Sequence, residues 1–386
     1  MSLKILISAG EVSGDQHIAR VVRALKLRAP DCEVRGMAGR YSEEAGAALD
    51  LDCYRTGAGM GFLELFRSGG KIVSSFRRLS ELLRTWRPDL LILVDYPDFN
   101  LRLAKVAKRL GVPVLYFIPP KVWAWRSGRV QKIRRYVDNV AAIFPFEPEF
   151  YRQRGYSRVA YVGHPLGDRG QELSGEVLRE ERLLLLPGSR RFEVERLLVP
   201  MLRAYGLLRE RHPNLKPVVV LAPNIDPSWV RGVIGDKVSV DIVDAISWSH
   251  GDALAEMRSA KVGILKSGTC NLEAAMAGLP FVCVYSGTLL AKVIVSLFVK
   301  LKEYSPVNII RPGTVKELMR LNLEAQDVVS SLEPIIGDGA ARCELEAGLS
   351  EVRDALMRAE GSNQGLNVAD RVAGLALSII GKDCKG

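Results

Sequence analysis

The sequence predicts two doubly wound α/β domains, each built on a parallel sheet with crossover helices. Short apolar runs bounded by turns alternate with longer helical stretches, an alternation that is typical of parallel strands joined by helices. This rhythm lapses at 166–180, in a polar stretch that contains glycine, and then starts again. The length of 386 residues is also about twice that of a typical domain.

The predicted strands fall into two series on either side of that lapse. The first series is "LKILISA", "LLILVDY", "PVLYFI", "NVAAIFPF" and "RVAYVGHP", and the second is "RLLLLPG", "KPVVVLAP", "VSVDIVD", "KVGILKSGT" and "PFVCVY". We therefore expect an N-terminal domain at 1–170 and a second domain at 171–363. The amphipathic stretch at 367–380, within the C-terminal segment 364–386, predicts a terminal helix that packs on one domain or the other.

Composition limits the classes of partner. The chain has 54 Lys and Arg against 44 Asp and Glu, a net charge of +10, which suits nucleic acid, anionic lipid or a phosphorylated substrate. Its six cysteines form no C-x-x-C pair and its four histidines are widely spaced, so we expect a reducing compartment and no metal site. No secretory signal is apparent, and the apolar stretch at 289–301 is too short to cross a bilayer, although it could lie on one. These features predict a cytoplasmic protein.

The first glycine loop follows the strand "LKILISA". Gly10 and Gly14 give the spacing G-x-x-x-G, which differs from the G-x-G-x-x-G of dinucleotide-binding domains. Glu11 and Asp15 place two carboxylates where a pyrophosphate would require main-chain N–H groups and no competing charge. The loop therefore predicts a ligand other than a phosphate.

Asp95 follows the apolar run "LLILV" directly. Open α/β sheets bind ligands at the carboxyl ends of their strands, so Asp95 is a candidate general base. Asp98, three residues later, is better explained as a helix cap or turn acid.

The stretch "VWAWRSGRVQKIRRY" places Trp123 and Arg126 among further aromatic and basic residues. This composition can bind nucleic acid, and it can equally bind a phosphorylated sugar through ring stacking and guanidinium contacts. Burial of both tryptophans in a core is the third interpretation. The residues alone leave all three open.

The second domain begins with a strand, a loop and a helix in "LLLLPGSRRFEVERL". The loop carries Gly188, Ser189 and Arg190 and no acid before Glu193, which predicts an anion site at a helix N-terminus. A plain turn with solvated arginines is the alternative.

A similar loop follows in "LKSGTCNLEAAMAG". Ser267, Gly268 and Thr269 precede a helix, and Glu273 lies one turn inside it. Two such loops in one domain predict one shared ligand, a sugar nucleotide whose ribose hydroxyls bond to Glu273. Simple capping of the helix by Ser267 or Thr269 is the alternative.

An apolar and basic segment lies at 62–79. Its first apolar residues, followed by a glycine pair at 69–70, fit a segment on an anionic lipid surface, and an ordinary amphipathic core helix is the alternative. The candidate membrane-contact residues are Phe62, Leu63, Leu65 and Phe66.

Several of these motifs, taken in order, resemble the lipid-A-disaccharide synthase family. They are "AGEVSGD" (9–15), "VDYPDFN" (94–100), "VWAWR" (122–126), "FPFE" (144–147), "VGHP" (162–165), "LLPGSR" (185–190) with "EVE" (193–195), and "SGTCNLEAAMAG" (267–278). The resemblance implies the GT-B architecture, in which two Rossmann-like domains face each other across a cleft and the second holds the donor nucleotide.

The resemblance also implies a reaction and a set of roles. The family transfers 2,3-diacylglucosamine from its UDP derivative to the 6-hydroxyl of 2,3-diacylglucosamine 1-phosphate, forms a β-1,6 bond with inversion, releases UDP and uses no cofactor. Asp95 would be the base and Arg190 would stabilise the leaving diphosphate. The donor-binding residues would be Gly188, Ser189, Arg190, Ser267, Gly268, Thr269, Glu273 and Asn308, and the acceptor-binding residues Gly10, Glu11, Ser13, Gly14, Asp15, Trp123 and Arg126.

The resemblance further implies a peripheral enzyme of the inner membrane of a Gram-negative bacterium, without nucleic acid as a partner. It allows a homodimer that exchanges C-terminal segments. Two other functions stay open: another GT-B enzyme such as a UDP-N-acetylglucosamine 2-epimerase, and a basic Rossmann-type protein that binds nucleic acid.

Overall fold

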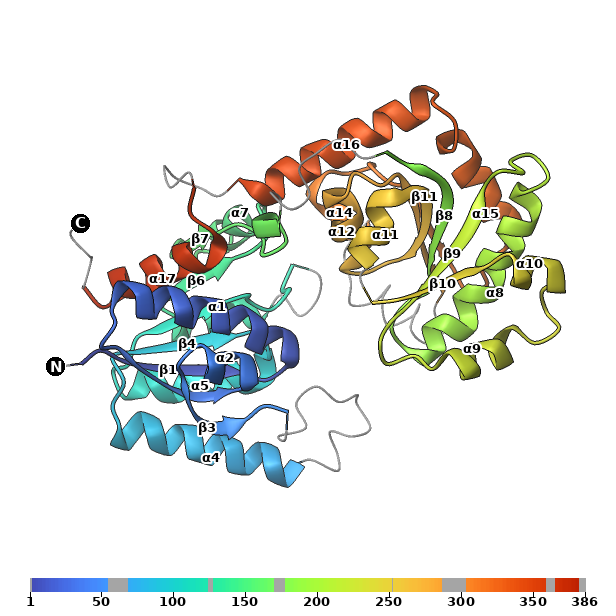
Figure 1. The fold of residues 1–386 in the computed structure, drawn as a ribbon. Helices are drawn as coiled ribbons and strands as arrows, with labels where there is room; N and C mark the ends of the chain where they lie inside the picture. The colour runs from blue at the N-terminus through green and yellow to red at the C-terminus, as the bar shows by residue number, and fades with distance from the viewer. Residues whose placement is uncertain are drawn as a thin grey trace. The chain divides into compact units, whose positions relative to one another are not determined.

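The computed structural model describes residues 2–54, 69–123, 128–169, 178–251, 253–286, 303–358 and 365–381 (Figure 1). The chain forms two compact units, one made of residues 1–168 and 358–386 and the other of residues 169–357. Each unit contains one parallel sheet with helices on both faces. The predicted doubly wound α/β class is confirmed.

The sheet of the first unit has seven parallel strands in the order β3-β2-β1-β4-β5-β6-β7. Their bounds are β1 Lys4–Ala9, β2 Glu33–Ala38, β3 Ala48–Asp52, β4 Leu90–Val94, β5 Val114–Phe117, β6 Asn139–Ala142 and β7 Val159–Tyr161. Strand β1 pairs with β2 on one side and with β4 on the other. All five residues of β4 are buried, as expected for a strand covered on both faces.

Helices cover both faces of this sheet (Figure 1). Their bounds are α1 Val12–Arg28, α2 Arg40–Glu44, α4 Gly69–Thr85, α5 Pro97–Arg109, α6 Arg129–Tyr136, α7 Glu147–Arg152 and α17 Val368–Ile379. Helix α1 packs against α17, while α4, α5 and α6 form a row on the opposite face. The helix predicted at 367–380 therefore lies on the first unit, although it follows the second unit in the sequence.

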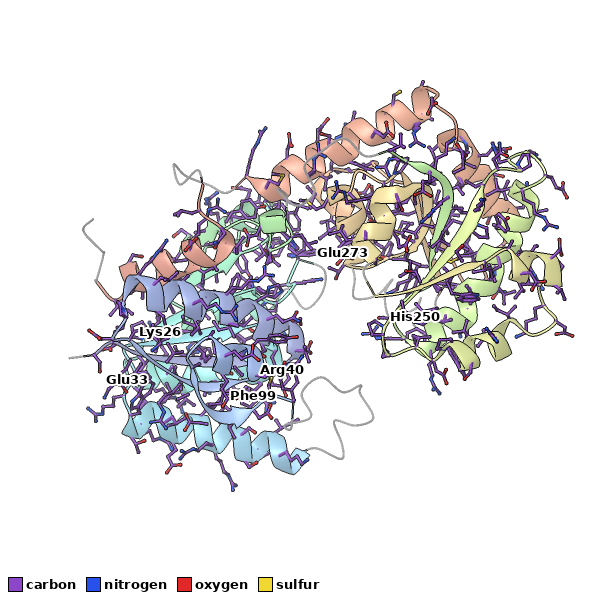
Figure 2. The ribbon with its side chains drawn as sticks, in the orientation of Figure 1. Lys26, Glu33, Arg40, Phe99, His250 and Glu273 are labelled. Atoms are coloured by element: carbon purple, nitrogen blue, oxygen red, sulfur yellow. The ribbon has the colours of Figure 1, made fainter. Side chains whose placement is uncertain are left out.

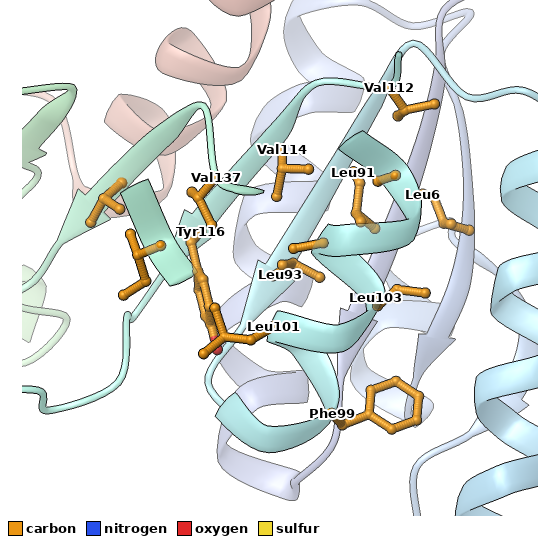
Figure 3. Packing of buried hydrophobic residues seen from close by; sticks show 14 of the residues in the cluster. Leu6, Leu91, Leu93, Phe99, Leu101, Leu103, Val112, Val114, Tyr116 and Val137 are labelled. Carbon is orange, nitrogen blue, oxygen red and sulfur yellow. The ribbon is translucent and has the colours of Figure 1, made fainter. Parts of the chain in front are cut away.

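One hydrophobic cluster fills the space between the sheet and this row of helices. Figure 3 shows Leu101 and Leu103 of α5 beside the strand residues Leu91 and Leu93, with Tyr116 of β5 at the edge of the group. Buried leucines of α4 extend the cluster on one side, and Ile133 of α6 extends it on the other. The start of α5 is therefore fixed against a rigid sheet.

The sheet of the second unit has six parallel strands in the order β10-β9-β8-β11-β12-β13. Their bounds are β8 Glu180–Leu186, β9 Lys216–Leu221, β10 Ser247–His250, β11 Ala260–Lys266, β12 Phe281–Ser286 and β13 Glu317–Arg320. The strand predicted from "VSVDIVD" is wrong. Those residues contain the helix α10, with Ile242 buried against the unit, and the strand that follows is the short polar edge strand β10.

Two groups of helices pack in the second unit. Helix α8 contacts α9, α10 and α15, and α12 contacts α11, α14 and α16. Their bounds are α8 Arg191–Leu208, α9 Pro227–Ile234, α10 Val240–Asp244, α11 Ala253–Ser259, α12 Cys270–Met276, α14 Pro306–Ile310, α15 Ala325–Leu332 and α16 Ala340–Met357. Across the parts of the chain described, no helix combines the length and apolarity that a membrane crossing requires.

The strand orders locate the ligand-binding edges. In the first sheet the order reverses between β1 and β4, and in the second it reverses between β8 and β11. Doubly wound sheets bind ligands at the carboxyl ends of the strands beside this reversal. The loops after these four strands carry Glu11, Asp95, Arg190 and Thr269, which sequence analysis had singled out.

Candidate active site

The loop after β1 is closely packed against the turn after β4. Gly10 lies between Ala9 and the helix N-cap Glu11. A Cβ atom at Gly10 would lie only 2.5 Å from ring atoms of Tyr96, so no larger residue fits without moving that ring. The absence of a side chain at Gly10 therefore allows the loops after β1 and β4 to pack closely where the strand order reverses.

The turn after β4 has an unusual main-chain conformation. Asp95 and Tyr96 are consecutive non-glycine residues with φ of 45° and 46°, in the left-handed region. Each such residue costs on the order of 1–3 kcal/mol and persists only where its surroundings hold it. Strain of this kind is concentrated at functional sites, which supports Asp95 as a functional residue.

Hydrogen bonds from two buried side chains hold this turn. Nδ2 of Asn100 donates to the carbonyl oxygens of Asp95 (2.8 Å) and Val94 (3.1 Å). The hydroxyl of Tyr116 donates to the same Asp95 carbonyl at 2.7 Å. Ser8 in turn donates from its hydroxyl to Oδ1 of Asn100 at 2.7 Å, which fixes the orientation of the amide. Sequence reasoning gave Asn100 no role, although it ends the quoted motif "VDYPDFN".

Glu11 and Asp95 form a pair of electrostatically coupled carboxyl groups. Partial burial, followed by repulsion from Asp95, raises the pKa of Glu11. Burial also raises the pKa of Asp95, while the N–H of Tyr96 and the charge of Lys121 oppose the rise. A carboxylate with a raised pKa is a stronger base than an ordinary aspartate.

Two histidines in this unit are held neutral. Burial, and then the charge of Arg20, lower the pKa of His17 to about 4. Burial, with the nearby His17 and Lys121, lowers the pKa of His164 to about 3. His164 comes from the motif "VGHP", to which sequence reasoning assigned no role. Both side chains are therefore neutral imidazoles and not imidazolium cations near pH 7.

The buried Glu147 contacts the half-buried Trp123 in the same unit. Oε1 of Glu147 accepts from Nε1 of Trp123 at 3.1 Å, and its Oε2 accepts from the N–H groups of Ile143 and Phe144, both at 3.1 Å. The tryptophan ring packs edge-on against Phe144 and Phe146. Burial raises the pKa of Glu147 to about 7. The predicted stacking of Trp123 on the acceptor sugar stays a prediction, since both its N–H and its ring already have protein partners.

Asp15 has protein partners inside its own unit, and its predicted contact with the acceptor stays a prediction. Its carboxylate is completely buried. It accepts from the N–H groups of Tyr41 and Ser42, from the Ser42 hydroxyl and from the Tyr54 hydroxyl. With both oxygens engaged inside the protein, Asp15 holds the loop after β2. The two residues before Asp15 have other surroundings: Gly14 packs on Ala9, and Ser13 is exposed to solvent.

The second unit contains a pocket of about 560 Å³ at the carboxyl edge of its sheet. It brings together most of the predicted donor-binding residues from the loops after β8 and β11 and from the first turns of the helices that follow. Those that line it are Gly188, Ser189, Arg190, Gly268, Thr269 and Glu273. Of these, Glu273 is labelled in Figure 2.

Within this pocket the loop after β8 differs from the prediction. The carboxylate of Glu193 folds back and accepts from the N–H groups of Ser189 (3.0 Å) and Arg190 (3.3 Å). Lys266 of β11 pairs with the same carboxylate at 2.8 Å. Gly188 has φ of 121°, and a Cβ atom there would lie 2.4 Å from Oε2 of Glu193. The loop N–H groups expected to bind a diphosphate are thus occupied by Glu193.

Positive charge at the pocket comes instead from side chains. The Arg190 side chain is 71% exposed and lies 3.7 Å from Glu193. Lys266 also lines the pocket. Arg191, which is not among the lining residues, stacks over Trp229 with its guanidinium carbon 5.1 Å from the ring centre. The hydroxyl of Ser267 donates to the carbonyl of Tyr304 and the residue is not among those that line the pocket.

Asn308 is also placed away from the pocket lining. Its Nδ2 donates to Oε1 of Glu317 (2.7 Å) and to the carbonyl of Val315 (2.9 Å), and its Oδ1 accepts from the N–H of Val315 (2.8 Å). The residue is buried. The polar atoms of its amide are thus used between residues 308 and 317, and the contact of Asn308 with the donor stays a prediction.

Several predicted residues lie outside the described part of the chain. They are Arg126, Phe62, Leu63, Leu65 and Phe66, together with the stretch 289–301. In the ranges that the structure does describe, no group of three or more His, Cys, Asp or Glu side chains is placed to bind a metal ion.

Known proteins resemble this chain over nearly its whole length. The family model described as lipid-A-disaccharide synthetase matches residues 5–363. A lipid-A-disaccharide synthase of Syntrophus aciditrophicus is 37% identical over 395 residues, which cover 98% of this chain and 99% of that protein.

Solved structures with the same fold are more distant in sequence. The glycosyltransferase of kitacinnamycin has a TM-score of 0.64 at 14% identity, covering 98% of this chain and 100% of that chain. A UDP-GlcNAc 2-epimerase of Neisseria meningitidis bound to UDP-GlcNAc has a TM-score of 0.60 at 14% identity, with coverage of 98% and 100%. At this identity the likeness shows the two-unit fold alone.

Proposed function

Because the chain belongs to the lipid-A-disaccharide synthetase family and is a glycosyltransferase of lipid A synthesis, we propose that it joins two acylated glucosamines. The donor is UDP-2,3-diacylglucosamine, the acceptor is 2,3-diacylglucosamine 1-phosphate, and the products are the β-1,6 disaccharide and UDP. The family match favours this function over the epimerase and the nucleic-acid-binding alternatives.

In this proposal the second unit binds the donor nucleotide. The support is the pocket of about 560 Å³ formed by the loops after β8 and β11, at the point where doubly wound sheets bind nucleotides. Glu273 on its wall accepts hydrogen bonds from ribose hydroxyls. Arg190, exposed at the rim, contacts the diphosphate and stabilises the charge that develops as UDP leaves.

Asp95 acts as the general base on the acceptor. It takes the proton from the 6-hydroxyl as that oxygen forms a bond to the anomeric carbon and the bond to UDP breaks, so a single displacement inverts the configuration. Its raised pKa brings the group closer to the pH at which a base is most effective. Glu11 lies in the same electrostatic environment and serves the acceptor hydroxyls.

The observation that carries this assignment is the strained turn at Asp95 and Tyr96. Two consecutive left-handed residues, held by Asn100 and Tyr116, place a carboxyl group at the reversal point of the first sheet. A turn that served only to connect a strand to a helix would not require this conformation.

Two finer features belong to the proposal. The net charge of +10 favours an anionic leaflet, so the enzyme works at the inner membrane surface, from which an acylated acceptor is drawn. The candidate contacts with the membrane are Phe62, Leu63, Leu65 and Phe66.

UDP release from the diacylated donor tests the function. It is measured with and without the acylated sugar phosphate, for the native chain and for Asp95→Asn. We expect release to require acceptor and to fall by at least about a thousandfold in Asp95→Asn, while UDP still binds. Release without acceptor would contradict the transferase assignment, and a fully active Asp95→Asn variant would contradict the base.

A further inference from the structure

Two neighbouring cavities lie on the first unit, beside the turn that holds Asp95. One has a volume of about 340 Å³ and lies between α4 and the start of α5. The other has a volume of about 230 Å³ and lies between α5 and α6. Both are lined by Pro97, Asp98 and Arg102, so they meet along the first turns of α5.

The larger cavity, called here the apolar cavity, is walled mostly by hydrophobic side chains. Phe99, labelled in Figures 2 and 3, packs edge-on against Phe76 with ring centres 5.8 Å apart and stacks on Tyr96 at 5.2 Å. Ile72 and Val73 of α4 complete the wall, and Val73 is 51% exposed. A site of this composition suits an alkyl chain.

The smaller cavity, called here the basic cavity, has the opposite character. Among the residues that the structure describes, four cationic side chains line it, and Asp98 is the only acid on its wall. The cations are Arg102, Lys105, Arg129 and Lys132. Asp98 is paired with the largely buried Arg129, with Oδ1 and Nη2 2.6 Å apart. The excess of positive charge at one concave site suits a phosphate group.

We propose that the two cavities form one binding site for the acceptor lipid. An acyl chain of the sugar phosphate occupies the apolar cavity, and its phosphate occupies the basic cavity. Only a ligand that is apolar at one end and anionic at the other complements both cavities at once. The inference rests on the proposed function and deepens it, since it locates the acceptor.

The position of Tyr96 favours the acceptor over a phospholipid of the bilayer. Tyr96 is a wall of the apolar cavity and directly follows Asp95, so an occupant of the site contacts the residue next to the candidate base. A lipid that served only to attach the enzyme to a membrane would have no need for this proximity. Arg102 lines both cavities and would contact the part of the ligand that joins chain to phosphate.

Equilibrium binding of 2,3-diacylglucosamine 1-phosphate, without donor, tests the proposal. The same measurement is made with the form that lacks the phosphate and with the form that lacks acyl chains. Lys105→Ala/Lys132→Ala should raise the Kd for the phosphorylated lipid by about tenfold or more and leave the unphosphorylated form unchanged. Val73→Asp should weaken the acylated forms by a similar factor and leave the deacylated form unchanged.

Matched variants separate a site from general charge effects. Arg109→Ala/Arg135→Ala removes the same charge from the exposed surfaces of α5 and α6, and Ser74→Asp adds the same charge one position along α4. None of these three residues lines either cavity. Both control variants should bind the acceptor with the Kd of the native chain. Equal losses in the control and cavity variants would overturn the proposal.

Vesicles containing phosphatidylglycerol distinguish the two lipid sources. If the cavity variants lose vesicle binding in parallel with acceptor binding, the cavities serve the bilayer and the proposal is wrong. UDP release by the native chain is measured in the same preparation. A native chain that fails to turn over defeats the proposed function, whereas normal turnover with unchanged acceptor binding in the cavity variants defeats only this inference.

Discussion

Asn100 and Asp95 are linked through the main chain, because Nδ2 of Asn100 donates to the carbonyl oxygen of Asp95 at 2.8 Å. The amide is oriented in turn by Ser8 and also bonds the carbonyl of Val94. A buried asparagine on α5 thus holds the left-handed turn on which the candidate base stands. In the proposed mechanism Asn100 is therefore a positioning residue, since it contacts the main chain of Asp95 and not a reacting atom.

Replacing Asn100 by Asp should impair turnover far more than substrate binding. The substitution keeps the volume but removes both donors to the turn, so the Asp95 carboxylate is no longer held in place. A small displacement of a reacting group can cost about a hundredfold in rate, and we expect kcat to fall by that order while the Kd for UDP is unchanged. Steady-state kinetics and UDP titration measure the two. A lower melting temperature with native kcat would show that Asn100 serves stability alone.

Lys121→Met should move the acidic limb of the pH profile. A general base must be deprotonated, so kcat/KM falls as pH drops through the pKa of Asp95. The charge of Lys121 lowers that pKa against the effect of burial. Without the charge the pKa rises further, and the limb shifts to higher pH. Lys316→Met, which removes an exposed lysine of the other unit, should keep the native profile. An identical limb in both variants would argue against Asp95 as the titrating base.

Glu147→Gln should change how stability depends on pH. Burial raises the folded-state pKa of Glu147 from 4.5 to about 7. Between these two values the folded state holds a proton that the unfolded state releases. The contribution of Glu147 to the free energy of unfolding is therefore full below about pH 4.5 and is lost as the pH rises through 7. The folded-state pKa values of His17 and His164 are lowered, so these two residues make the free energy of unfolding rise with pH.

The comparison between native chain and variant removes the histidine contribution. Relative to the native chain, Glu147→Gln should gain roughly 3 kcal/mol in free energy of unfolding between pH 4.5 and 8, whatever constant offset the lost hydrogen bonds cause. Urea unfolding across this range measures the difference. A difference that does not vary with pH would mean that Glu147 titrates normally in the folded protein.

Gly188→Ala should disturb the donor pocket. The positive φ disfavours any side chain, and the new Cβ atom would collide with the Glu193 carboxylate. We expect a loss of about 1–3 kcal/mol in stability and weaker UDP binding. Gly232→Ala on α9 is the control, because no atom outside its own helix lies within 4 Å of the added Cβ and its φ is ordinary. Calorimetric titration with UDP compares the two. Equal UDP affinity in both variants would contradict a role for this loop in donor binding.

The fold class followed from the sequence because buried parallel strands are short and continuously apolar. "LLILV" and "LLLL" are strands β4 and the end of β8, as predicted. Polar edge strands carry no such signal. Strand β10 has the sequence "SWSH", and the apolar residues just before it form a helix, which misled the prediction there.

The candidate site was predicted only in part, for a different reason. Position beside a strand end identified Asp95 and Arg190, since topology alone brings such residues to the ligand-binding edge. Whether a carboxylate faces a ligand or the protein depends on contacts distant in sequence. Asp15 is bound by Tyr41, Ser42 and Tyr54, and Glu193 by its own loop. Spacing along the chain carries no information about such contacts.

The return of α17 to the first unit sets the order in which the chain can mature during synthesis. The second unit, one continuous segment, is made before α17 leaves the ribosome. Until then, the face of α1 that α17 covers is exposed to water. The contacts that form only afterwards include the packing of α17 on α1, the hydrogen bond from Arg28 to the carbonyl of Asp370, and the hydrogen bond from the N–H of Val368 to Asp168. The unit translated first is therefore the last to be completed, and a nascent chain carries an exposed apolar helix face throughout translation of the second unit.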